Sequence, residues 1–162
     1  MKVYMTKKTY KKLQDKLCYL TTTKALEMKK ILKEAKSGGG GMHDNAAYEN
    51  ALMRERILAQ QIKELNENLQ NVTFIDNLLI DAASVGIGTW VKVSISDSSG
   101  KNKTREYSIL GSNESDPNKD IISYLSPIGK SLIGGYVGEE VEVVIADKCS
   151  VFKILEIKKA ML

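Results

Sequence analysis

The chain has 162 residues, enough for one domain or two small ones, and its apolar content of 43% is sufficient for a buried core. It contains no apolar run of the length that crosses a bilayer, and its opening residues, MKVYMTKKTYKK, lack the apolar centre of a signal peptide. We therefore expect a cytoplasmic protein with no membrane partner, in which Cys18 and Cys149 are reduced thiols.

The net charge of +4 is distributed unevenly along the chain. Residues 1–36 carry eleven lysines and three acidic residues, whereas residues 44–77 carry three basic and six acidic residues. These net charges of +8 and −3 favour pairing of the two stretches within one chain. The surplus positive charge suits contact with RNA, DNA or the acidic wall of a channel, and the alternative is an ordinary solvated lysine face.

The first predicted element is a helix that begins at Thr6, a suitable N-cap, and ends near Ala35. The phase of its apolar positions shifts near Thr21, where three consecutive threonines lower helix propensity, so we expect an irregular turn there. The apolar positions on the two sides of this shift form one seam: Leu13, Leu17, Leu20, Ala25, Met28, Leu32 and Ala35.

A second helix is predicted from Asp44 or Asn45, both good N-caps, to about Asn77. Between the helices, residues 36–44 read KSGGGGMHD, and four consecutive glycines interrupt a helix. Helix, polar tip and helix predict an antiparallel hairpin, so that residues 1–77 form a coiled-coil domain with its tip at residues 37–45. The seam of the second helix is apolar at every position except one: Tyr48, Ala51, Glu55, Leu58, Ile62, Leu65, Leu69 and Val72.

After Asn77 the apolar residues alternate with polar ones, which is typical of short strands. The alternation covers residues 91–95, 107–109, 141–145 and 151–157, with turn signals at residues 96–102, 111–119 and 146–149. Residues 126–132, SPIGKSL, fit one short helix entered at Pro127. We thus predict an α+β protein whose second domain, residues 78–162, is a small antiparallel sheet, with the boundary near residues 77–82.

Four stretches of the chain, in this order, resemble the Gre transcript-cleavage factors of bacteria: YMTKKTYKKLQDKL at the start, NAAY at residues 45–48, NVTFID at residues 71–76 and SPIGKSLIGGYVGEEVEV at residues 126–143. The resemblance covers essentially the whole chain. It implies an N-terminal antiparallel coiled coil, an FKBP-like C-terminal sheet domain and bacterial RNA polymerase as the partner. In this family the globular domain docks near the rim of the polymerase secondary channel and the rod enters that channel, where nascent RNA is a candidate contact of the lysine-rich arm. The implied docking residues are Ser126, Pro127, Ile128, Leu132, Ile133 and Gly134.

The tip of this family usually reads GDLxENAEY, and its two acids three residues apart are understood to hold the second magnesium ion of the polymerase active site. The matching tip residues here are Gly40, Gly41, Met42, His43, Asp44, Asn45, Ala46, Ala47 and Tyr48. Gly41 stands at the position of the first acid and Asp44 at the position of the second, in a loop one residue longer. We therefore expect Asp44 to share the magnesium ion and to support cleavage weakly, the alternative being that it only caps the helix. His43 is a poor substitute, since imidazole suits zinc, copper or nickel better, and we interpret it as a surface residue.

Several functions remain open on the sequence alone. The chain either supports transcript cleavage weakly or occupies the channel as a regulator without cleavage, and in both cases the bond-breaking chemistry belongs to the polymerase, so the chain is no enzyme by itself. A coiled-coil adaptor is a second class, although a rod that enters a channel is expected to be monomeric when free. An FKBP-like prolyl isomerase is a third class and requires a proline pocket lined by aromatic residues, drawn here from Trp90, Tyr107, Tyr124, Tyr136 and Phe152.

Overall fold

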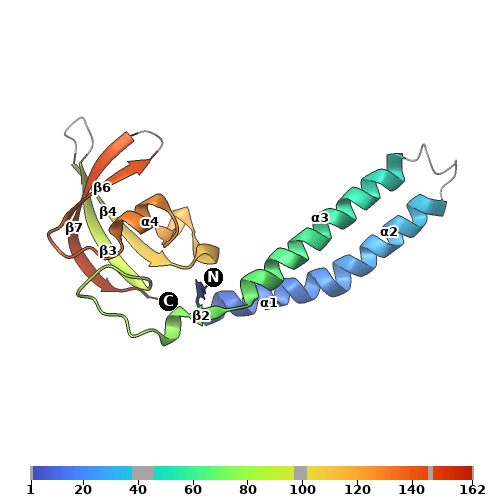
Figure 1. Ribbon diagram of the computed structural model, residues 1–162, viewed down its shortest axis with the longest axis horizontal. Helices are drawn as coiled ribbons and strands as arrows, with labels where there is room; N and C mark the ends of the chain where they lie inside the picture. Colours follow the sequence, from blue (N-terminus) through green and yellow to red (C-terminus); the bar gives the residue numbers. More distant parts are fainter. Residues whose placement is uncertain (1, 38–45, 97–101, 146–147, 162) are drawn as a thin grey trace. The chain divides into compact units, whose positions relative to one another are not determined.

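The computed structural model describes residues 2–37, 46–96, 102–145 and 148–161 (Figure 1). The chain divides into two compact units, which we call the sheet unit (Met1–Thr9 with Val72–Leu162) and the hairpin unit (Tyr10–Asn71). The predicted α+β class is confirmed. The division into functional domains near residues 77–82 stays a prediction. None of the described helices is long and apolar enough to span a membrane.

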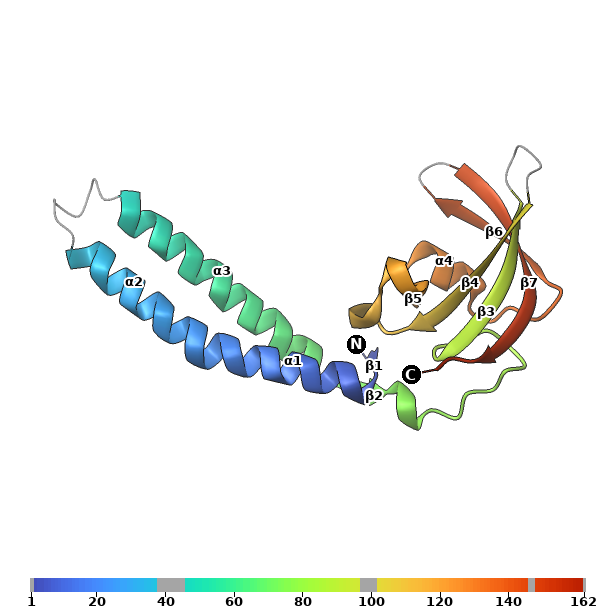
Figure 2. The ribbon, with the colours of Figure 1, turned by 180° about the vertical axis from the view of Figure 1, so that it is seen from behind.

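The hairpin unit consists of two antiparallel helical arms (Figures 1 and 2). The first arm contains α1 (Lys7–Tyr19), whose first three residues still belong to the sheet unit, the π-helical turn η1 (Leu20–Lys24) and α2 (Ala25–Ser37). The second arm is the helix α3 (Ala46–Leu69), which is about 36 Å long at 1.5 Å per residue. The predicted hairpin is thus confirmed.

The irregular turn predicted at the threonines is the π-helical turn η1. The hydroxyl of Thr21 donates a hydrogen bond of 2.8 Å to the carbonyl oxygen of Leu17, and that of Thr22 donates one of 2.6 Å to the carbonyl oxygen of Cys18. Such back-bonding by threonine competes with the regular helical bonds. Because the wider turn holds an additional residue, the seam passes from Leu20 to Ala25 in a step of five and continues on one face.

The second helix ends at Leu69, earlier than the predicted Asn77. Asn71 has a left-handed backbone with φ of 56°, which asparagine tolerates better than most residues and which ends helices. The following residues, Val-Thr-Phe, favour extended backbone and form the strand β2 (Val72–Phe74). Within α3, the predicted seam residue Glu55 is exposed and Leu52 is half-buried. The predicted N-caps Asp44 and Asn45 lie outside the described residues.

The sheet unit contains a five-stranded sheet in the order β5-β4-β3-β7-β6. Its strands are β3 (Thr89–Ser96), β4 (Asn102–Leu110), β5 (Ile121–Ser123), β6 (Glu140–Ile145) and β7 (Lys148–Lys159). The prediction of a purely antiparallel sheet is wrong in one respect, because β5 pairs in parallel with β4. The segment between them contains the 3-10 turns η3 (Ser112–Glu114) and η4 (Pro117–Lys119), which bring the chain back to run in the same direction.

The core of this unit is formed by the inward side chains of the sheet and by the helix α4 (Pro127–Leu132). Val91, Val93 and Ile154 are fully buried in it. On β7 the inward positions change parity between Ile154 and Ile157, because Leu155 is the extra residue of a β-bulge opposite Lys92 and Val93. The bulge therefore keeps both halves of this long strand facing the same core.

A separate two-stranded parallel sheet joins β1 (Val3–Met5) to β2, with Val3 opposite Val72 and Met5 opposite Phe74. Neither strand is predicted by the apolar pattern of the sequence, which instead continues the second helix through β2. Met5 and Ile75, the residues at or just after their ends, are fully buried. The 3-10 turn η2 (Ile75–Asn77) follows β2 directly.

Candidate functional site

The end of the hairpin is framed by the last residue of α2, Ser37, and the first residue of α3, Ala46. The proposed tip residues between them, Gly41, Met42, His43, Asp44 and Asn45, lie outside the described residues. Tyr48 is among the described residues; it lies in the first turn of α3 and is half-buried. Glu49 is the only acidic residue in the first described turn of α3.

The described residues contain no group of three or more His, Cys, Asp or Glu side chains placed to hold a metal ion. The carboxylate that the sequence offers for magnesium, Asp44, lies outside these residues. A single carboxylate supplies few of the roughly six oxygen ligands that magnesium takes.

The predicted docking segment forms a capped short helix on the core. The N–H of Gly129 donates to the hydroxyl oxygen of Ser126 at 3.0 Å, and that hydroxyl donates to the carbonyl oxygen of Ser123 at 2.7 Å. Pro127 occupies the first helical turn, where its missing N–H costs nothing. Ile128 packs against the core and Leu132 is fully buried. These residues of the segment thus have a structural role.

Other side chains of this region are exposed and apolar. Ile133 retains 39% of its surface and Leu125 retains 37%, while Tyr136 and Val137 retain 60% and 58%. Of these four residues, only Ile133 was predicted from the sequence as a docking residue, whereas Tyr136 was considered for a proline pocket. The sequence does contain a signal for the exposure of Tyr136 and Val137. They form a two-residue apolar segment between Gly135 and Gly138, and such a segment is too short to be a buried strand or helix. We call Ile133, Tyr136 and Val137, which lie in the loop after α4, the apolar loop surface.

The loop that carries the apolar loop surface is held by backbone hydrogen bonds. The N–H of Gly134, at φ of 89°, donates to the carbonyl oxygen of Val85 at 2.8 Å. The N–H of Gly138, at φ of 92°, donates to the carbonyl oxygen of Ile154 at 2.7 Å. The N–H of Tyr136 donates to the carboxylate of Glu139 at 2.9 Å. Ordered, exposed apolar side chains of this kind are suited to protein binding, because little conformational entropy remains to be lost.

The five aromatic residues considered for a proline pocket have different environments. Phe152 lies in the core, and Tyr124 meets the ring of Tyr4 edge-on with centroids 5.6 Å apart. The ammonium group of Lys158 lies 5.3 Å from the ring centroid of Trp90. Tyr107 packs partly buried against the core, and burial raises its pKa. Four of the five side chains, Phe152, Tyr107, Tyr124 and Trp90, therefore pack in or against the two core clusters of the sheet unit, whereas Tyr136 is exposed.

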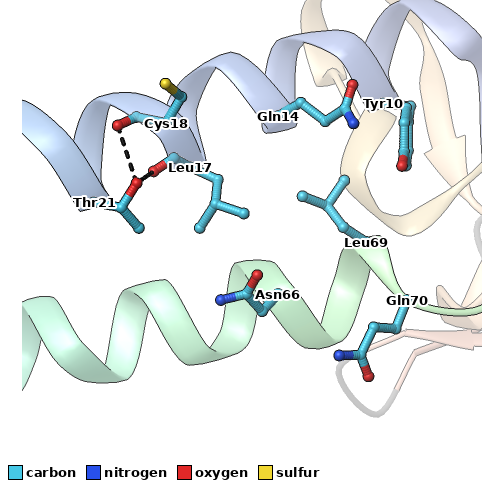
Figure 3. A pocket seen from close by; sticks show the side chains of 8 residues that line it. All are labelled: Tyr10, Gln14, Leu17, Cys18, Thr21, Asn66, Leu69 and Gln70. Carbon is cyan, nitrogen blue, oxygen red and sulfur yellow. Dashed lines mark hydrogen bonds between the residues drawn. The ribbon is translucent and has the colours of Figure 1, made fainter.

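A groove of about 490 Å³ lies between α1 and the last turns of α3 (Figure 3). Leu17 and Leu69 point toward each other across it, and neither is fully buried. The remaining lining is neutral and polar or carries a thiol: Tyr10, Gln14, Cys18, Thr21, Asn66 and Gln70. Cys18 and Cys149 are both free and exposed. The groove provides hydrogen-bonding side chains but no carboxylate or ammonium group for acid–base chemistry.

The first arm presents its lysines to solvent. Among the described residues of the hairpin, the ion pairs run along single helices, from Lys24 to Glu27 at 2.8 Å and from Lys63 to Glu67 at 4.0 Å. The hydrogen bond that the Lys24 ammonium donates to the Glu27 carboxylate raises the pKa of Lys24. Pairing of the arms thus depends on the apolar seam and on the long-range attraction between their opposite net charges.

Comparisons with known proteins cover both units. Residues 80–159 match the family model "Transcription elongation factor, GreA/GreB, C-term", and residues 3–73 match "Transcription elongation factor, N-terminal". The chain is 37% identical over 155 residues to transcription elongation factor GreA of Clostridium botulinum (strain Eklund 17B / Type B), covering 96% of this chain and 94% of that protein. It is 38% identical over 157 residues to transcription elongation factor GreA of Acetivibrio thermocellus, covering 97% and 96%.

Among solved structures, the chain aligns with GreA factor homolog 1 of Thermus thermophilus at 21% identity and a TM-score of 0.44, over 98% of this chain and 99% of that one. The family assignment depends on the sequence matches, which extend through both the hairpin unit and the sheet unit. This chain belongs to the GreA/GreB family of transcription elongation factors.

Proposed function

We propose that this elongation factor is an accessory factor of bacterial RNA polymerase, whose sheet unit docks at the rim of the secondary channel and whose hairpin enters that channel to modulate elongation. The observation that carries the proposal is the match of both units to the family, from residue 3 to residue 159. An antiparallel hairpin whose second helix is about 36 Å long supplies the reach that such an entry requires.

The apolar loop surface is the proposed docking element of the sheet unit. Its exposed members follow directly after a structural segment in which Ser126 caps α4 and Leu132 anchors the helix in the core. Tyrosine is enriched among the residues that dominate binding energy at protein interfaces. Residues of the predicted docking segment that are buried, Leu132 above all, support the loop rather than contact the polymerase.

Docking is tested by the double variant Tyr136→Ala/Val137→Ser in a polymerase-binding titration. We expect the dissociation constant to rise by about tenfold or more, since truncation of a central aromatic anchor costs about 1.4 kcal/mol or more. Leu79→Ser is the matched control, because Leu79 is fully exposed on a different loop. Unchanged affinity in the double variant would exclude the apolar loop surface as the docking element.

The proposed chemistry of the tip is the sharing of a magnesium ion with the polymerase. A carboxylate of Asp44 would add one ligand to an ion held by the acids of the polymerase and help to orient the attacking water. Gly41, at the position of the first family acid, supplies no second carboxylate. We therefore propose weak support of transcript cleavage, with the bond-breaking step performed by the polymerase.

This tip chemistry is tested on a stalled, backtracked polymerase complex. We expect slow RNA cleavage with the wild-type chain, faster cleavage with Gly41→Asp, and loss of the residual stimulation with Asp44→Ala. Met42→Ala is the control at the same tip, since it removes no ligand for magnesium. If Gly41→Asp leaves cleavage unchanged while the protein still binds, the shared-metal role of Asp44 is wrong.

The second candidate function is that of a non-cleaving regulator, and the glycine at position 41 is the observation that favours it. Such a chain would bind the polymerase and modulate elongation or pausing without releasing an RNA fragment. The lysine face of the first arm is proposed to follow nascent RNA or an acidic wall of the channel, which crosslinking from Lys33 to the transcript would detect. Sedimentation at several concentrations separates both functions from a self-associating adaptor.

A further inference from the structure

The chain passes between the sheet unit and the hairpin unit at two places, which we call the chain crossings. Both lie close to the short parallel pair of strands β1 and β2, which we call the ladder. In the first crossing, β1 ends at Met5 and α1 begins at Lys7, with the unit boundary after Thr9. In the second crossing, α3 ends at Leu69 and β2 begins at Val72, with the boundary after Asn71. Because β1 and β2 are paired, both crossings begin from a single element of the sheet unit.

This ladder requires support from the rest of the sheet unit. It has two strands of three residues each, and an isolated two-stranded sheet is at best marginally stable in water. Part of the support is apolar, since Met5 and Ile75 are fully buried. The backbone also packs closely, because a Cβ added at Gly111 would overlap the carbonyl oxygen of Tyr4.

The polar part of the support comes from two carboxylates. Glu114 accepts hydrogen bonds from the N–H of Thr6 at 2.6 Å and from the N–H of Gly111 at 3.0 Å, one on each oxygen. Asp76 accepts a hydrogen bond of 2.8 Å from the N–H of Lys7. All five of these residues belong to the sheet unit, although Thr6 and Glu114 are 108 positions apart. The two acids thus satisfy consecutive N–H groups where α1 begins.

The charges of α1 explain why acids are needed there. The first turn of α1 carries no acidic residue, and its first two residues are Lys7 and Lys8. Positive side chains oppose the partial positive charge at a helix N-terminus, whereas negative ones stabilise it. Thr6 supplies a cap, since its hydroxyl oxygen accepts from the N–H of Thr9 at 3.2 Å. Asp76 and Glu114 supply the negative charge that the sequence of the helix lacks.

We propose that Asp76 and Glu114 are positioning residues of this elongation factor: they clamp the first turn of α1 to the sheet unit and so keep both chain crossings short and ordered. This inference rests on the proposed function at RNA polymerase. Without the clamp the first turn frays, the crossing gains several flexible residues, and the hairpin acts less effectively on the polymerase centre. Docking by the apolar loop surface does not depend on the clamp.

The structural half of the test is hydrogen exchange in the full chain. In Glu114→Ala and Asp76→Ala we expect exchange at residues 6–10 to accelerate by about tenfold, the usual effect of losing one helix cap, with residues 91–95 unaffected. Glu114→Gln should be intermediate, because its amide oxygen still accepts one of the two hydrogen bonds. Glu106→Ala is the matched control, since Glu106 is an exposed acid on β4 of the same unit. Unchanged exchange at residues 6–10 in both alanine variants would overturn the clamp.

The functional half measures the effect of each variant on elongation or RNA cleavage as a function of protein concentration. We expect the alanine variants to lose at least half of the maximal effect while the half-maximal concentration stays within twofold of wild type. Faster exchange with an unchanged maximal effect would overturn the positioning role. A wild-type chain without effect on polymerase would overturn the proposed function and the positioning role together, and exchange alone would then decide whether the clamp exists.

Discussion

The sheet unit and the hairpin unit are stabilised in different ways. Val91, Ile109 and Ile154 of the sheet unit have no exposed surface, whereas α1 contains no buried residue at all. Among the buried apolar residues of the described hairpin, the large side chains of Leu20, Met28 and Leu65 retain 8–9% of their surface, and only the small Ala51 retains less, at 3%. The sheet unit thus depends on close packing of an interior, and the hairpin depends on keeping a narrow seam in register. Substitutions of the same kind should therefore have different effects in the two units.

The largest expected difference is between Ile154→Ala and Leu58→Ala. Ile154 is fully buried on the central part of β7, so truncation leaves a cavity and should cost about 3–4 kcal/mol of unfolding free energy. Leu58 is half-buried in the seam of α3, so its truncation should cost about 1 kcal/mol. Urea unfolding with hydrogen exchange in each unit measures both values. Equal losses would show that the seam is packed as tightly as the sheet core.

A smaller loss is expected where the backbone of α4 approaches the sheet. Gly129 lies inside this helix, where alanine would normally raise stability, but a Cβ there would overlap the carbonyl oxygen of Ser123. We expect Gly129→Ala to cost about 2 kcal/mol, because a backbone atom has to move. Gly86→Ala is the control, with nothing within 4 Å of the added Cβ, and should be neutral or slightly stabilising. A neutral Gly129→Ala in thermal unfolding would contradict the tight packing of α4.

These contrasts also explain what the sequence could predict. The hairpin and its shifted seam were predictable because apolar periodicity over many residues identifies long helices. The longer strands β3, β4, β6 and β7 were predictable from alternation. The strands β1, β2 and β5 were not, since each has only three residues, and the partners β1 and β2 come from distant parts of the chain. Local pattern carries no information about such pairing.

The candidate site shows the same limit. Leu132 and Ile133 are adjacent and both apolar, yet the first is fully buried and the second is 39% exposed. Both were predicted from the sequence as docking residues. Which of the two is buried depends on how α4 packs on the sheet, and local sequence does not show this. Conversely, the carboxylates of Asp76 and Glu114 occur in turns without a sequence motif. Their role is visible only in the structure, where they accept hydrogen bonds from the N–H groups at the start of α1.

The hairpin offers a change that should increase stability. Deletion of Thr22 shortens the step from Leu20 to Ala25 from five residues to four, so the seam gains the regular three-four spacing of an α-helix. Removal of one threonine and of its competing hydrogen bond should stabilise the first arm by about 1 kcal/mol. Thr22→Ala is the control that keeps the chain length. Slower hydrogen exchange at residues 13–35 would support this, whereas lower helicity by circular dichroism would mean that η1 fits the partner helix better than a regular turn.

The smallest expected effect concerns pH and again separates buried from exposed side chains. Burial raises the pKa of Tyr107 above its ordinary value of 10.0, so the folded chain favours the neutral phenol. Its contribution to stability is therefore complete below pH 10.0 and is lost as the pH rises through the higher pKa of the folded state, with a slope of at most about 1.4 kcal/mol per pH unit. Tyr107→Phe should unfold in urea with a weaker decline above pH 10 than the wild type. If the unfolding free energies of Tyr107→Phe and of the wild type decline in parallel above pH 10, the phenol of Tyr107 is hydrated in solution. The edge of the sheet core would then be less tightly packed than the structure shows.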